Sequence, residues 1–186
     1  MDILRLATVL QLFVCVFAYR ESEVKRPGSI GELISALNTS GPVWLLRRTY
    51  TEENHTCVYS VKKSLSNTEY VFTQYYMDNN KPVQHLLYAH LYMTGELEGA
   101  SMRVSTEKGA ATGKEYGLHT WDEDNHCAIL YLRNHNGQQH CELYAWNDDV
   151  AEAEKNCLSN YELYCENFKK NEQIVYFDTC TVQTGC

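Results

Sequence analysis

Apolar and polar side chains alternate along most of the chain between residues 43 and 146, in runs of six to ten residues that short turn-forming segments separate. A period of two places every second side chain on the same face, which is typical of strands with one buried face. The pattern predicts eight strands, at Val43–Tyr50, Thr56–Leu65, Glu69–Met77, Gln84–Met93, Ser101–Thr106, Glu115–Trp121, Cys127–Asn134 and Gln138–Trp146.

The last two of these runs carry the strongest local signal in the chain. They flank Asn136-Gly137, a dipeptide that adopts positive φ at little cost and favours a tight hairpin turn. We therefore predict a β-hairpin from Cys127 to Trp146.

Helical patterns lie on either side of the strands. Ser29 and Glu32 form a capping box in front of a short apolar repeat, which predicts a helix from about Ile30 to Leu37. After the strands, an apolar face with helical spacing predicts a second helix, formed by Val150, Ala153, Cys157, Tyr161, Tyr164 and Phe168. The segment from Gln173 to Thr179 is expected to lie extended against the strands.

Together these elements predict an all-β fold with flanking helices. Eight strands joined by short turns favour an eight-stranded antiparallel up-and-down β-barrel, with the N-terminal helix short and the C-terminal helix packed outside. A barrel of this strand number is wide enough to hold one small ligand. A β-sandwich is the main alternative, because strand spacing alone does not separate the two folds.

The first 18 residues are predicted to be a secretory signal peptide. Arg5 precedes an apolar run, Leu6–Phe17, which is too short to span a bilayer, and we expect cleavage after Ala18. Residues 19–186 then form a single domain, which we expect to be secreted and extracellular.

Cysteine usage agrees with export. Cysteines of an exported protein are expected to form disulfides, and no Cys-x-x-Cys spacing supports a zinc site. The number of cysteines that remain after cleavage is odd, so that one cysteine is either free or paired with another molecule. Both a monomer and a disulfide-linked dimer therefore stay open. Asn38 and Asn54 begin glycosylation sequons. The seven cysteines are Cys57, Cys127, Cys141, Cys157, Cys165, Cys180 and Cys186.

Charge and motifs argue against several function classes. The net charge is −8 and no basic cluster occurs, so neither nucleic acid nor an anionic membrane is expected as a partner. We find no phosphate-binding glycine loop, zinc-protease motif or nucleophile elbow, and the histidines share no ligand spacing. The sequence predicts no enzyme activity, no metal and no cofactor.

Aromatic side chains are the more useful signal. Fourteen tyrosines and three tryptophans combine large apolar bodies with polar atoms, as the lining of a ligand pocket requires, although many of them would also fill a β core.

The spacing of several elements resembles that of the tick salivary lipocalins that include the histamine-binding proteins. Cys127-Ala128-Ile129, Glu142-Leu143-Tyr144 and Cys157 follow one another at twelve-residue intervals, as in that family. Trp44 after Gly41-Pro42, Cys57 before Val58-Tyr59, and Cys180 after Tyr176-Phe177-Asp178-Thr179 are also similar. The resemblance implies a lipocalin-like barrel with the disulfides Cys57–Cys180 and Cys127–Cys157, and it leaves the pairing of Cys141, Cys165 and Cys186 open.

The resemblance also implies an amine-binding pattern, with one departure. That pattern has an aspartate directly after the first cysteine, where this chain has Ala128. Glu142 is retained, and strand alternation places it on one face with Tyr144 and Trp146. One carboxylate can still pair with one ammonium group, and neighbouring aromatic rings can add cation–π attraction.

Three functions are consistent with these observations. The first is sequestration of a host mediator, a biogenic amine such as histamine or serotonin, to suppress inflammation and immunity; Glu142 is the counter-ion, and Trp44, Tyr144 and Trp146 are cage candidates. The second is transport of an apolar ligand (a fatty acid, eicosanoid or sterol), favoured by Ala128, Leu130 and Leu132 on one face of their strand. The third is binding of a host immune protein through the outer surface of the barrel.

Overall fold

The computed structural model describes residues 26–95, 99–133 and 138–183 of the 186-residue chain. The predicted signal peptide, the Asn136-Gly137 turn and Cys186 lie outside the described residues, so that the predictions made for them stay predictions.

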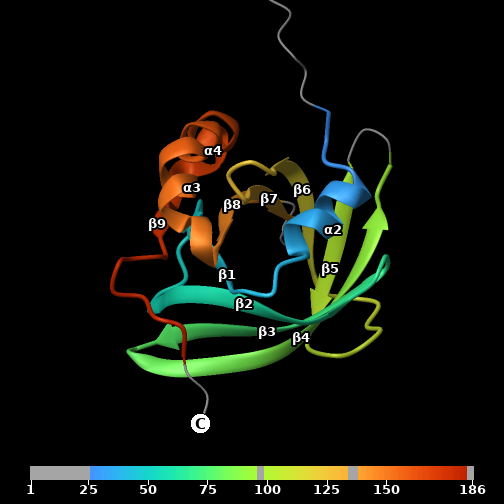
Figure 1. The fold of residues 1–186 in the computed structure, drawn as a ribbon, viewed down its shortest axis with the longest axis horizontal. Helices are drawn as coiled ribbons and strands as arrows, with labels where there is room; N and C mark the ends of the chain where they lie inside the picture. The colour runs from blue at the N-terminus through green and yellow to red at the C-terminus, as the bar shows by residue number, and fades with distance from the viewer. Residues whose placement is uncertain (1–25, 96–98, 134–137, 184–186) are drawn as a thin grey trace, which may run out of the picture.

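Eight antiparallel strands close into a barrel (Figure 1). Each strand pairs with its neighbour in the sequence, and β1 pairs with both β2 and β8, which leaves no gap in the wall. The structure therefore confirms the up-and-down barrel and excludes the sandwich. The strands are β1 Val43–Arg48, β2 His55–Leu65, β3 Glu69–Asp78, β4 Lys81–Met93, β5 Ala100–Ser105, β6 Lys114–Asp122, β7 Cys127–Arg133 and β8 Gln139–Trp146.

Two strands differ from the sequence prediction by more than one residue at an end, and the others agree to within one residue. Strand β1 ends at Arg48, two residues earlier than expected. Strand β4 begins at Lys81 and includes Pro82, which lies opposite Met77 of β3 near the hairpin end. Proline is tolerated at the start of a strand, where its missing N–H interrupts no central ladder.

A short helix, α2 (Ile30–Leu37), closes one end of the barrel (Figure 1). The predicted capping box begins it: the Ser29 amide donates to Glu32 Oε2 at 2.7 Å, and the Glu32 amide donates to Ser29 Oγ at 3.3 Å. Its buried side chains, Leu33, Ala36 and Leu37, face the barrel interior. The helix is thus fixed by its cap on one side and by apolar burial on the other.

The C-terminal segment packs against the outside of the wall next to β8 (Figure 1). The sequence predicted one helix there, but the apolar positions are spread over three segments. Helix α3 (Val150–Asn156) follows the 3-10 turn η1 (Asn147–Asp149), and Cys157 separates α3 from α4 (Leu158–Cys165). A 3-10 segment, η2 (Glu166–Asn171), then leads to β9 (Gln173–Ile174), which pairs with β1.

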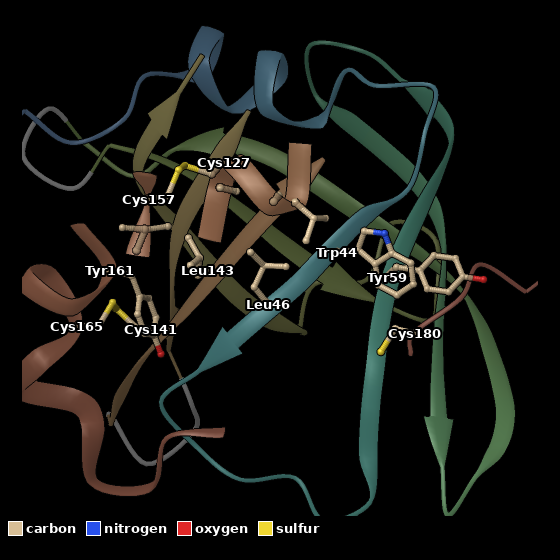
Figure 2. Packing of buried hydrophobic residues seen from close by; sticks show 14 residues of the cluster. Trp44, Leu46, Tyr59, Cys127, Cys141, Leu143, Cys157, Tyr161, Cys165 and Cys180 are labelled. Carbon is tan, nitrogen blue, oxygen red and sulfur yellow. A yellow bond between two sulfur atoms is a disulfide. The ribbon is translucent and has the colours of Figure 1, made fainter. Parts of the chain in front are cut away.

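Between these helices and the barrel lies a solid apolar core, which we call the outer core (Figure 2). It contains three side chains of β8 on one face of that strand, together with buried aromatic rings from β1, β2 and α4. Its buried members are Trp44, Leu46, Tyr59, Cys127, Ile129, Cys141, Leu143, Ala145, Val150, Ala153, Cys157, Tyr161, Cys165 and Cys180.

Three disulfides hold the outer core. Two of them, Cys57–Cys180 and Cys127–Cys157, are the pairs that the resemblance implied. The third, Cys141–Cys165, joins β8 to α4 and was left open by the sequence. Among residues 26–95, 99–133 and 138–183, no helix has both the length and the apolar character that a membrane crossing requires.

Candidate ligand-binding site

A cavity of about 340 Å³ lies inside the barrel and runs from helix α2 to the opposite end. Its volume falls within the range of small-molecule pockets, roughly 300–1,000 Å³. The part next to α2 is lined by Tyr70 and otherwise mainly by apolar side chains from the helix and from several strands. The apolar residues are Leu33, Ala36, Leu37, Leu45, Val58, Phe72, Leu87, Met102, Val104, Ala128 and Leu130.

The lining becomes polar with distance from α2. On β3 it changes from Phe72 to Gln74 and Tyr76, and on β5 from Met102 to Ser105. At the far end, Tyr76 bonds His85 across the β3–β4 hairpin, with 3.1 Å between the hydroxyl and Nε2. The cavity therefore has one apolar end and one polar end.

Glu142 lies near the middle of β8 and lines this cavity. Its side chain is only 1% exposed. The Tyr50 hydroxyl donates to Oε1, and the Tyr144 hydroxyl donates to Oε2 at 2.5 Å. A carboxylate has about four acceptor sites, so that two bonds leave room for a further donor from a ligand.

Burial sets the protonation behaviour of this cluster. It raises the pKa of Glu142, while the bonds from Tyr144 and Tyr50 and the charges of Lys114 and Arg48 act in the opposite direction. Burial, followed by the nearby Glu142 charge, also raises the pKa of Tyr50 and of Tyr144 above the ordinary value. Both hydroxyls therefore stay protonated and serve as donors to the carboxylate.

A second acid in the lining, Glu52, is already paired. Its carboxylate lies 3.3 Å from Arg48 Nη1, 3.1 Å from His55 Nδ1 and 3.6 Å from Lys114 Nζ. Burial raises the pKa of Glu52, but Lys114 and Arg48 outweigh that effect and hold it below its ordinary value. Arg48 is also fixed by Gln173, whose Oε1 accepts from Nε at 2.8 Å and from Nη2 at 2.6 Å.

The structure brings together four of the predicted ligand-binding residues. Glu142, Tyr144, Ala128 and Leu130 all line the cavity, with Ala128 opposite Tyr144 and Leu130 opposite Glu142 across the β7–β8 ladder. Alternation along the two strands therefore identified a shared inner face, and the prediction that these residues bind a ligand remains to be tested.

The two predicted tryptophans lie elsewhere. Trp44 belongs to the outer core, where its ring packs on Tyr59 at 4.6 Å and Nε1 donates to Asn147 Oδ1 at 2.8 Å (Figure 2). Trp146 donates from Nε1 to the Ala36 carbonyl at 2.9 Å and so fastens β8 to helix α2. Neither ring is part of the cavity lining.

The sequence did not single out Tyr50, Arg48, Glu52, Lys114 or Tyr116, all of which line the cavity. A bulge interrupts the pairing of β1 with β8 between Leu45 and Arg47, so that simple alternation does not carry through to Arg48 or to Tyr50, which follows β1. Tyr116 could have been found, because it alternates with the inward-facing Leu118 on β6.

The two predicted glycosylation sites lie on the surface of the molecule. Asn38, at the end of α2, and Asn54, in the segment before β2, are both exposed, and their glycosylation remains a prediction.

Among the described residues, one group has the spacing of metal ligands, namely Asp122 with Cys127 and Cys157. Its two sulfurs are bonded to each other, which removes both thiolates that a metal would need.

The family of the chain follows from a sequence comparison. A family model described as tick histamine binding protein matches residues 26–182. The chain belongs to the tick histamine-binding protein family. No curated protein sequence matches it. The description of this family is that of a ligand-binding protein.

Solved lipocalin structures share the fold of this tick family member. The AM182–serotonin complex superposes with a TM-score of 0.57 at 15% identity, covering 80% of this chain and 92% of that one. Japanin from Rhipicephalus appendiculatus bound to cholesterol superposes with a TM-score of 0.53 at 16% identity, covering 76% of this chain and 95% of that one. The siderocalin Ex-FABP superposes with a TM-score of 0.51 at 12% identity, covering 80% of this chain and 99% of that one. At these identities the structures show a common barrel.

Proposed function

We propose that this tick lipocalin is a secreted protein that sequesters a small biogenic amine, with Glu142 as the counter-ion. The observation that carries the proposal is a buried carboxylate in the cavity lining, oriented by two tyrosine hydroxyls. The neighbouring cations Arg48 and Lys114 both form ion pairs with Glu52. Glu142 is therefore the acid that an incoming ammonium group would neutralise.

The energetic reason is the cost of desolvation. A protonated amine that enters an apolar cavity loses hydration, which only an acid or several acceptors can replace. Folding has already desolvated Glu142. Pairing with an ammonium group therefore offsets the desolvation cost of the carboxylate as well as that of the amine. The rings of Tyr50, Tyr144 and Tyr116 line the same region and can add cation–π attraction.

The family and one neighbour support this ligand class. The matching family is named for histamine, and AM182 was solved with serotonin. Three disulfides are typical of an extracellular protein, which supports secretion. Removal of a host amine would suppress inflammation. The alternative of a host immune protein bound to the outer surface stays a prediction.

Titration calorimetry with histamine and serotonin tests the counter-ion. We expect Glu142→Gln to weaken binding of the better ligand by roughly 10- to 100-fold, the usual value of a hydrogen bond to a charged group. Glu53→Gln is the matched control, because Glu53 is exposed in the segment that also contains Glu52 and carries the same charge. Equal binding by wild type and Glu142→Gln would contradict the assignment.

A second variant restores the aspartate of the family pattern. Ala128 lies in the cavity opposite Tyr144, so that Ala128→Asp adds a carboxylate on the wall next to Glu142. We expect higher affinity for amines and lower affinity for apolar ligands, measured by the same titrations. If neither affinity changes, position 128 has no part in binding.

The apolar end of the cavity favours a second candidate function, transport of an apolar ligand. Leu33, Leu37 and Met102 offer no polar partner there, and Japanin was solved with cholesterol. Mass spectrometry of organic extracts from the secreted protein tests this candidate, because it presumes no ligand. A sterol, eicosanoid or fatty acid retained in stoichiometric amount would support it, whereas empty barrels from every source would count against it.

A further inference from the structure

The acid and the apolar end belong to one continuous cavity. Trp146, which is bonded to helix α2, follows Glu142 by four residues on the same strand. Four residues of strand span about 13 Å, and the tilt of barrel strands reduces this to about 10 Å along the barrel axis. An apolar space of that depth therefore separates the carboxylate of Glu142 from α2.

The walls of this space are mostly apolar, although Tyr70, which packs on Phe72, also lines the cavity on the α2 side and carries a hydroxyl. Helix α2 contributes Leu33, Ala36 and Leu37, and the strands contribute Phe72, Met102 and Ala128 on the way from α2 to the level of Tyr144. A ligand with polar atoms along its whole length would leave most of them unpaired here, at a cost of roughly 1–3 kcal/mol each.

From this arrangement we infer that the preferred ligand class is an elongated cationic amphiphile. Such a ligand places one primary ammonium group on Glu142, and its unbranched or flat apolar body extends to α2. The inference rests on the proposed function, because it keeps Glu142 as the counter-ion, and it adds the size and the polarity of the remainder of the ligand.

Other ligand types use only part of the cavity. A compact amine neutralises Glu142 but leaves the apolar space beside α2 unfilled, which forfeits buried apolar area. A fatty acid fills that space but brings a second negative charge to Glu142, and like charges at short range disfavour each other. An uncharged sterol leaves the buried carboxylate without a cation.

A homologous series of n-alkylamines tests the inference by calorimetry on the intact mature protein. From n-butylamine through n-hexylamine to n-octylamine, each added methylene should raise the affinity about fourfold until the chain reaches α2, after which the gain should stop. Octanoate and 1-octanol carry the same chain with a different head group. Each should bind at least tenfold more weakly than n-octylamine.

Ala36→Leu is the variant that addresses the α2 end. Ala36 lines the cavity from α2, so that leucine, a good helix former, shortens the apolar space. It should lower the affinity for n-octylamine several-fold and leave that for n-butylamine unchanged. If this variant does not fold, the alkylamine series on the wild-type protein still decides the matter.

The outcomes separate the two proposals. If histamine or n-butylamine binds through Glu142 but longer chains gain nothing, the inference fails and the proposed function stands. Octanoate binding as tightly as n-octylamine would also overturn the inference. If no amine of any length binds, the proposed function fails as well.

Discussion

The two faces of strand β8 perform different tasks. Cys141, Leu143 and Ala145 point outward into the outer core, where each is at most 1% exposed and packed against the C-terminal helices (Figure 2). Glu142 and Tyr144 point inward and border a cavity. One face of β8 therefore belongs to the packed outer core, and the other face borders the cavity.

This difference suggests where stability and function reside. The outer core holds apolar side chains and three disulfides, and none of its members lines the cavity. The inner face carries a buried acid and borders a cavity, both of which cost stability. A barrel that is fastened from outside can tolerate an interior shaped for a ligand.

The largest effect on the outer core should come from its longest covalent link. Cys57–Cys180 joins residues 123 positions apart, and the chain-entropy model assigns a loop of that length about 5 kcal/mol. For Cys141–Cys165, 24 positions apart, the same model gives about 3.5 kcal/mol. We expect urea unfolding of the two double alanine variants to show this order. Equal losses of unfolding free energy in the two variants would mean that loop length does not govern the stabilisation by these disulfides.

A pair of leucine truncations compares the two faces directly. Leu143 is fully buried in the outer core, and Leu143→Ala should cost about 4 kcal/mol in unfolding free energy while ligand affinity stays the same. Leu130 borders the existing cavity, so that Leu130→Ala should cost only about 2 kcal/mol, because fewer packing contacts are lost. Its ligand affinity should change.

Urea unfolding and calorimetry on both variants provide the measurements. If Leu130→Ala were as costly as Leu143→Ala and left affinity intact, the distinction between a packed outer face and a functional inner face would be wrong.

Most of the fold could be predicted because its signals are local. The capping box of Ser29 and Glu32 fixed the start of α2, and alternation located the strands to within a few residues. The same alternation put Glu142 and Tyr144 on one face. Long-range events carry no such signal: Cys141 could have paired with Cys165 or Cys186, and only the packing of α4 against β8 joins it to Cys165.

The composition of the site was harder to predict for the same reason. Trp146 shares the face of Glu142, but its place at the end of the strand makes it a partner of Ala36 and not of the cavity. Arg48 and Tyr50 reach the cavity only after the irregularity in β1. A sequence pattern shows which residues share a face, whereas depth along the barrel and bulges depend on the assembled wall.

The smallest effect concerns the acid itself in the absence of ligand. At pH 7 we expect Glu142→Gln to be more stable than the wild type by roughly 1 kcal/mol, because it removes a buried charge that serves binding and not folding. Such a gain, combined with weaker amine binding, would identify Glu142 as a residue kept at the expense of stability.

The pH dependence of this gap in unfolding free energy between the wild type and Glu142→Gln identifies its cause. Burial raises the pKa of Glu142, so that between the ordinary glutamate value and the raised one the folded protein binds more protons than the unfolded chain. Wild-type stability then increases as the pH falls through this window, relative to the glutamine variant, which does not titrate. Urea unfolding of both proteins from pH 7 to about pH 4 should show the gap closing. A gap that widened instead would mean that the bonds from Tyr50 and Tyr144 favour the charged carboxylate more strongly than burial disfavours it.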